Sequence, residues 1–142
     1  MPAAAKRYER RLTALGFLWA LPISLVGIIL GVLSASPVTF KDGMMVFRGD
    51  RGLAYLLLTR RGFAAMTLGR VVLVTKRLSM SLWMHELEHA RQAERWGLLY
   101  IPAYLVLQLR YGYWKNPFEN AARKVEEEFK ADRPHEADFI AV

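Results

Sequence analysis

A long uncharged segment, from Leu12 to Leu33, constrains the fold of this chain more than any other feature. A helix that rises about 1.5 Å per residue over this segment would cross the roughly 30 Å hydrocarbon core of a bilayer. Membrane helices tolerate the glycines and the proline within it, and a basic flank such as residues 1–11 is typical of them. We therefore predict a transmembrane anchor over residues 12–33. A buried core helix and a cleavable signal peptide are the alternatives, although the run exceeds the apolar length of most signals.

The positive charge of the chain favours a membrane surface over nucleic acid as its partner. The chain has 20 Lys and Arg residues against 13 Asp and Glu residues, a formal net charge of +7. Between Arg48 and Arg77 the basic residues stand singly or in pairs, without the pattern of a nucleic-acid-binding helix, and attraction to anionic lipid headgroups accounts for them. We expect no nucleic-acid partner. The basic flank favours a cytoplasmic N-terminus, so that with a single span the remaining chain lies outside the cytoplasm.

The absence of cysteine restricts the chemistry of the chain. It excludes disulfide frameworks, metal sites built on thiolates and cysteine nucleophiles. Any bound metal must therefore use the side chains of His, Asp or Glu. The length of 142 residues allows one compact domain after the anchor. We place this domain at residues 37–130 and an acidic tail at residues 131–142.

The pattern of the domain changes from strands to helices, which predicts an α+β fold with a short β-sheet. Runs of β-branched residues between glycine turns predict several short strands before residue 79. The apolar residues 53–59 fit either a strand or a short helix. Residues 98–109 are too few to span a bilayer and predict a buried or interfacial helix. Pro117 suits the first turn of a last helix.

The segment His85-Glu86-Leu87-Glu88-His89 carries the clearest chemical signal, an HExxH motif. A helix is expected over residues 82–96, with a serine N-cap at Ser79 or Ser81 and Gly97 as its C-cap. The spacing of four then puts both imidazoles on one helix face, where they can bind the same Zn²⁺ ion.

The acid between the two histidines and an amide after them complete the expected helical site. Glu86 lies beside the metal without binding it and can take a proton from water, as the general base of a hydrolase does. Gln92, one turn beyond His89, faces the same side and can hydrogen-bond a ligand of the site. An ordinary charged helix face is the alternative interpretation of the whole segment.

A catalytic zinc site requires a third protein ligand, and Glu119 is the best candidate. It is the only acid in a long neutral stretch, and it lies in the first turn of the last predicted helix. Such an isolated carboxylate requires a partner if it is buried, and a metal ion is one. His135 is the second candidate for the third ligand. The alternative role of Glu119 is to cap its own helix near the positive N-terminal end. Glu94 lies on the same helix as the motif but points away from the two histidines.

Four stretches of the chain together resemble a known family. They are TLGRVVLV, HELEHARQAERWG, an apolar P-x-Y segment and GYWKNPFENAAR, and they lie within roughly residues 66–124. This combination resembles the zincin metallopeptidases of the gluzincin type and small bacterial HExxH proteins. The resemblance implies a zinc site of His85, His89 and Glu119, with Glu86 as the general base.

The resemblance also implies a substrate-binding strand and reveals one departure. Thr67, Leu68 and Gly69 would lie on an edge strand that pairs with an extended peptide. The chain departs from the thermolysin-like pattern E-x-x-x-D, because Arg123 stands four residues after Glu119. No carboxylate at that spacing orients the first histidine. The expectation is that a nearby polar group does so instead: Asn116, Asn120 or a backbone carbonyl.

These observations predict a membrane-anchored zinc peptidase. The expected partners are a peptide or protein substrate and the membrane, with a helper protein or a second copy as further possibilities because a small domain offers little room for a deep cleft. A non-catalytic, membrane-tethered binding or scaffolding module with structural zinc is the alternative, and it requires a fourth ligand that closes the site.

Overall fold

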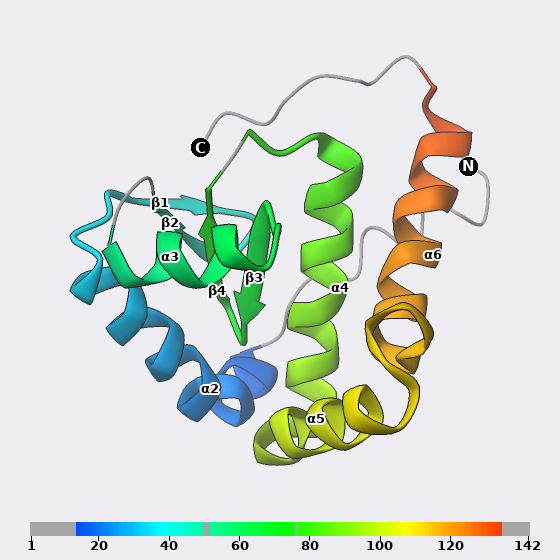
Figure 1. Ribbon diagram of the computed structural model, residues 1–142, viewed down its shortest axis with the longest axis horizontal. Coiled ribbons are helices and arrows are strands. Elements are labelled where there is room, and N and C mark those ends of the chain that lie inside the picture. Colours follow the sequence, from blue (N-terminus) through cyan, green and yellow to red (C-terminus); the bar gives the residue numbers. More distant parts are fainter. Residues whose placement is uncertain (1–13, 50–51, 76, 135–142) are drawn as a thin grey trace.

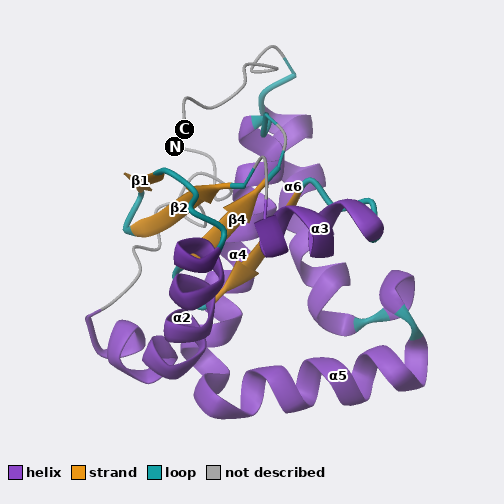
Figure 2. Cartoon of the chain, turned by 60° about the vertical axis from the view of Figure 1, so that its left-hand side comes forward, coloured by secondary structure: helices purple, strands orange, loops and turns teal. Residues whose placement is uncertain are grey.

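The computed structural model describes residues 14–49, 52–75 and 77–134, and within them the expected α+β architecture is confirmed. A small mixed sheet lies between two layers of helices (Figures 1 and 2). Residues 1–11 and the end of the predicted acidic tail lie outside the described residues. The elements are α2 (Ala14–Leu33), β1 (Val38–Lys41), β2 (Met44–Arg48), α3 (Gly52–Arg60), β3 (Ala65–Leu68), β4 (Val71–Val74), α4 (Met80–Trp96), η1 (Gly97–Leu99), α5 (Tyr100–Tyr111), η2 (Tyr113–Lys115) and α6 (Pro117–Asp132).

The sheet has the strand order β1-β2-β4-β3, with β3 at one edge. β2 and β4 are parallel, while β1 and β3 pair antiparallel with their neighbours. The central strand β4 has the sequence VVLV and is buried on both faces, as an unbroken apolar strand requires. Val72 and Val74 pack toward α4, whereas Val71 and Leu73 pack in the cluster with α3 and α2. The sheet therefore lies between α4 on one face and α2 with α3 on the other.

Residues 53–59, which fit either a strand or a helix by sequence, form the helix α3. Gly52 begins it with a φ of 80°, a conformation that favours glycine. The backbone N–H of Ala54 donates to the Ser34 hydroxyl, 3.0 Å away, which ties the start of α3 to the end of α2. Ala54 and Leu58 face the core, and the remaining leucines of α3 are exposed.

Helix α2 is long and apolar enough to cross a membrane, but it also packs on the domain. Its small residues form the packed face along the whole helix. A Cβ atom on Gly27 would come within 2.7 Å of Val71, and one on Gly31 within 2.4 Å of the Phe47 ring. These glycines therefore allow close approach to the domain. The opposite face of α2 exposes large apolar side chains.

The last three helices begin and end where local chemistry requires. Ser79 caps α4, accepting from the N–H of Leu82, and Gly97 ends it with a φ of 54°. Asn116 caps α6, and Pro117 occupies its first turn. α4 and α6 lie side by side, and α5 links them at one end (Figure 1). In α5 only Tyr100 is buried, so the helix predicted as buried or interfacial shows a largely exposed apolar surface.

Candidate metal centre

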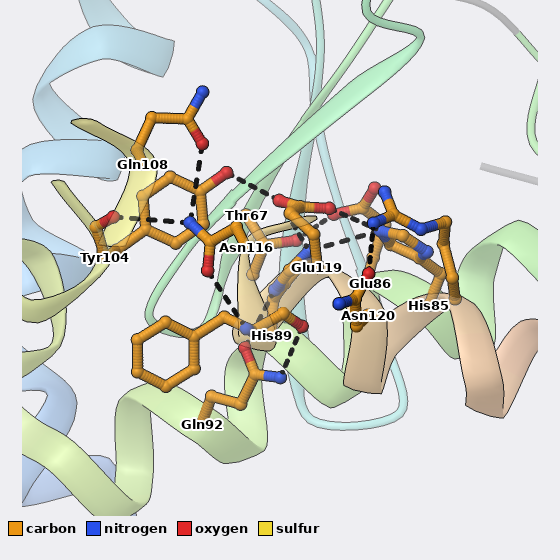
Figure 3. Close-up of polar contacts among 12 residues, drawn as sticks. Thr67, His85, Glu86, His89, Gln92, Tyr104, Gln108, Asn116, Glu119 and Asn120 are labelled. Carbon is orange, nitrogen blue, oxygen red and sulfur yellow. Dashed lines mark hydrogen bonds and ion pairs between the residues drawn. The ribbon is translucent and has the colours of Figure 1, made fainter. Parts of the chain in front are cut away.

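Both histidines of the HExxH motif lie on the face of α4 that meets α6. His85 and His89 are buried, and their Nε2 atoms lie 3.2 Å apart (Figure 3). A neutral imidazole carries a proton on one ring nitrogen only. If both Nδ1 atoms are protonated, two lone pairs face each other across this distance, and a cation between them satisfies both.

Glu119, in the first turn of α6, brings a carboxylate to the same point. Its Oε2 lies 3.5 Å from Nε2 of His85, and its Oε1 lies 3.4 Å from Nε2 of His89. The two Nε2 atoms and the two oxygens of this carboxylate thus lie 3.2–3.5 Å from their nearest neighbours in the cluster. Ligands at about 2.0–2.1 Å from a tetrahedral zinc ion lie about 3.3 Å from one another. The spacing between neighbouring donor atoms of the cluster therefore matches that of zinc ligands.

The donor set fits Zn²⁺ as well as the distances do. Oε1 of Glu119 accepts a hydrogen bond from the Tyr104 hydroxyl at 2.6 Å, but its buried Oε2 has no hydrogen-bond partner. A buried carboxylate oxygen without a hydrogen bond is costly, and a cation offsets this cost. Two imidazoles and one carboxylate are a common ligand set of catalytic zinc. Among the described residues, His85, His89 and Glu119 form the one cluster of this kind.

Each histidine has a partner on the far side of its ring. Nδ1 of His85 lies 3.2 Å from Oε2 of Glu126, within ion-pair distance although the angle is not that of a hydrogen bond. Nδ1 of His89 lies 3.0 Å from Oε1 of Gln92, whose Nε2 in turn donates to the backbone of Phe118. Such partners favour the tautomer protonated at Nδ1, which leaves Nε2 free for a metal.

Glu126 corrects the expectation about the group that orients His85. Asn116 does not reach the ring: it caps α6 and donates to the backbone oxygen of Tyr104. Asn120 accepts from Arg123 instead. Glu126 lies two helical turns after Glu119, so both carboxylates project from the same face of α6. This spacing of seven was the signal in the sequence, within a run of three consecutive glutamates.

The electrostatics of the cluster without metal are those of a buried ion pair. Burial disfavours the charged form of His85 and is the largest single influence, but Glu119 and Glu126 together outweigh it and raise its pKa to about 9. Burial likewise opposes the charged form of His89, but Glu119 and Glu86 raise its pKa. Burial opposes ionisation of Glu119, yet the two histidines hold its pKa well below the usual range. Protons and a metal ion therefore compete for the same three side chains.

Glu86 is buried beside the histidines and is held by the sheet. Its Oε2 accepts a hydrogen bond of 2.5 Å from the Thr67 hydroxyl of β3 (Figure 3). Thr67 thus fixes one oxygen of the carboxylate, and the metal cluster does not include Glu86. This placement suits an acid that transfers protons near the metal without binding it.

A cavity of about 370 Å³ adjoins the site, a volume within the range of ligand pockets. His85, Glu86, His89 and Glu119 line its floor, and side chains of α3, β3 and α5 line the remainder. The cavity leaves space for a reacting group beside the cluster of His85, His89 and Glu119. Such space is a property of catalytic rather than closed structural sites.

The three residues expected to bind substrate have different positions. Thr67 and Leu68 lie on the edge strand β3 and line the cavity. Gly69 follows β3 in the turn to β4, with a φ of 63°, and faces α2, where an added Cβ would come within 2.3 Å of the Ser24 hydroxyl. Gly69 is therefore a packing residue, which corrects its expected placement on the strand.

Two other candidate ligands do not join the cluster. Glu94 forms an ion pair of 2.7 Å with Arg70, away from the histidines, as its position on the helix predicted. His135 lies outside the described residues. No family model, no curated protein and no solved structure matches the chain. The interpretation of the site therefore rests on its residues and their geometry.

Proposed function

We propose that the protein is a zinc-dependent peptidase attached to a membrane. The observation that carries this proposal is the meeting of two Nε2 atoms and a carboxylate at 3.2–3.5 Å beside a cavity. Glu86, a buried acid with a fixed orientation, borders the same cavity. Metal ligands, general base and substrate space thus lie together, which is the set of parts that hydrolysis requires.

Each side chain of the site has a definite task in this proposal. His85, His89 and Glu119 hold the metal, and bound Zn²⁺ supplies Lewis acidity to the reaction. Glu86 accepts a proton from the attacking water and returns it to the leaving nitrogen. The hydrogen bond from Thr67 leaves one oxygen of Glu86 available for that proton. β3 stands at the edge of the sheet, and in this proposal its outer backbone edge pairs with an extended peptide.

The variant Glu86→Gln separates catalysis from metal binding. It removes the proton acceptor but no metal ligand, so we expect hydrolysis of a peptide library to fall by roughly 10²–10⁴-fold. The zinc content should stay at the wild-type level. Glu88→Gln, on the same helix but paired with Arg91, is the matched control and should retain activity. Full activity of Glu86→Gln would refute the mechanism.

A structural zinc site in a binding or scaffolding module is the alternative function. It requires a fourth protein ligand, and the described residues bring three together. The adjoining cavity favours an open coordination position instead. The spectrum of a cobalt-substituted sample distinguishes the two, because an open site responds to small anionic inhibitors and a closed site does not.

The proposed attachment uses α2, which is apolar over its whole length. As a single span with the basic flank 1–11 in the cytoplasm, it would place the domain on the extracytoplasmic side. Protease protection in sealed vesicles, with a tag at either terminus, tests this orientation. Protection of the C-terminal tag from protease in right-side-out vesicles would contradict this orientation.

A further inference from the structure

Three segments of the domain combine exposed apolar side chains with an absence of acids. They are α2, α3 with its following residue Arg61, and residues 97–115, which comprise η1, α5 and η2. We call them the acid-free segments. Their charged residues are all basic, namely Arg60, Arg61, Arg110 and Lys115. The acids of the helical core lie instead on α4 and α6.

Most exposed apolar side chains of the described residues lie in these segments. Val38, Phe40 and Trp96 are the exceptions, and Trp96 directly precedes η1. Leu109 of α5 is 89% exposed and Trp114 of η2 is 76% exposed. So many exposed large apolar side chains are uncommon on proteins that meet only water, and they indicate a binding surface.

The acid-free segments form one continuous region. Gly97 of η1 lies against the Trp19 ring of α2, where an added Cβ would come within 2.0 Å of the indole nitrogen. α2 also contacts α3 through the hydrogen bond between Ala54 and Ser34. In Figures 1 and 2, α2 and α5 lie at the same end of the molecule.

The composition of this region is that of a membrane–water interface. Tryptophan and tyrosine are enriched at that level of a bilayer, together with basic residues that reach the headgroups. Arg110 lies over the ring of Tyr111 at 5.3 Å, and Arg123 of α6 lies over the ring of Trp114 at the same distance. The net positive charge complements anionic headgroups.

The mouth of the cavity belongs to the same region. Of the residues that line the cavity, the exposed ones are Leu57, Arg61 and Leu105. Two of them are leucines and the third is basic, and all three lie in or directly after α3 and α5. A surface that meets lipid through these helices therefore brings the entrance of the site to the membrane.

We propose that α3 and residues 97–115 dock on the surface of an anionic lipid bilayer, beside α2 as the membrane anchor, and hold the entrance of the cavity at the membrane interface. If the protein is the peptidase proposed above, its substrate is then a segment of a membrane-bound protein that lies close to the bilayer. A second copy of the chain fits this surface less well, because two surfaces without acids would repel each other. The candidate membrane span α2 lies in the same region, which favours lipid.

The absence of cysteine allows a direct test on the full chain. The variant Leu109→Cys carries an environment-sensitive fluorophore on α5, and Glu127→Cys carries it on the exposed side of α6. Both are reconstituted into vesicles of phosphatidylcholine with phosphatidylglycerol. The label at position 109 should shift to the blue and be quenched by spin-labelled lipid, whereas the label at 127 should behave as in water. Equal, water-like signals at both positions would overturn the docking.

The same label distinguishes lipid from a second copy. If the emission at position 109 is already shifted in detergent-solubilised protein that sediments as a dimer, another chain covers the surface and the proposal is wrong. Sedimentation as a monomer supports the proposal, since detergent rather than a second chain then covers the surface. Replacement of Arg110 and Lys115 by Glu should reduce the vesicle-induced shift, since the headgroups then meet acids.

Cleavage assays test the substrate class. A peptide attached to a lipid anchor should be cleaved about tenfold faster or more than the same peptide in solution, because both partners share the vesicle surface. Leu105→Glu should reduce this ratio toward one while zinc content is unchanged. Equal cleavage of both peptides by the wild type overturns the substrate class but leaves the peptidase proposal intact. A lipid-embedded label with no cleavage of either peptide overturns the peptidase proposal and leaves the docking intact.

Discussion

The helix pair α4–α6 and the acid-free segments depart from ordinary packing in opposite directions. The pair buries two imidazoles and two carboxylates, Glu86 and Glu119, which proteins rarely remove from water without compensation. The acid-free segments leave leucines and tryptophans exposed, which proteins usually bury or scatter. Each departure has a simple explanation in a missing partner. In our proposals a bound cation would compensate the first region, and a lipid surface would cover the second.

The largest expected effect comes from removing one ligand of the first region. His89→Ala leaves one imidazole and one carboxylate, and we expect stoichiometric zinc to be lost. Gln92→Ala, one turn further along α4, removes a hydrogen-bond partner of His89 and the bond to the Phe118 backbone but no metal ligand, so it should weaken binding while retaining measurable zinc. Metal analysis after gel filtration measures both. Wild-type zinc content in His89→Ala would contradict the assignment of a metal site to the α4–α6 pair.

Glu126→Gln tests whether the carboxylate behind His85 orients the ring. We expect zinc affinity to fall by roughly 10–100-fold, as for other partners of metal-bound histidines. Glu127→Gln, the next residue on α6, faces solvent and serves as the control. A competition titration with a chromophoric chelator gives both affinities. Equal affinities for the two variants would show that Glu126 plays no part in zinc binding.

The pH dependence of stability distinguishes the metal-free cluster from the loaded one. Protonated His85 is favoured in the folded state, because its pKa rises from 6.5 to about 9. The resulting stabilisation is complete below pH 6.5 and is lost as the pH rises through 9. The melting temperature of the metal-free protein should therefore fall by about 5 °C over this window. The zinc-loaded protein, with neutral imidazoles, should show no such fall, and a fall of equal size in both would contradict the assignment.

The smallest effect tests how α2, one of the acid-free segments, packs on the sheet. Gly27→Ala adds a methyl group within 2.7 Å of Val71, and we expect a loss of roughly 1 kcal/mol in unfolding free energy. Val26→Ala, on the exposed face of α2, should not strain the packing against the domain. Denaturant titration in mild detergent compares them. A neutral Gly27→Ala would indicate that α2 does not pack on the sheet.

Local chemistry made much of the fold predictable from the sequence. Ser79, Gly97 and the pair Asn116 and Pro117 mark helix ends through hydrogen bonds and dihedral angles that depend on neighbours in the chain. The HExxH spacing placed two imidazoles on one face for the same reason. Glu119 stood out because it was the one acid in an apolar stretch, and the structure brings it to the histidines.

The remaining features depend on contacts between distant segments. The sequence does not show which face of α6 meets α4, so it could not tell which of the three consecutive glutamates, Glu126, Glu127 or Glu128, lies behind His85. The apolar composition of α2 suits lipid and protein equally well, so its packing against Val71 and Phe47 was not predictable. Residues 53–59 adopt a helix because Gly52 and Ser34 begin it, a tertiary contact that periodicity does not reveal.

The metal content of the purified wild-type chain tests the central claim most directly. We predict one zinc ion per chain by mass spectrometry of the digested protein, removed by chelation and restored by added Zn²⁺. A folded wild-type protein that holds no zinc, even after incubation with excess metal and gel filtration, would contradict the account.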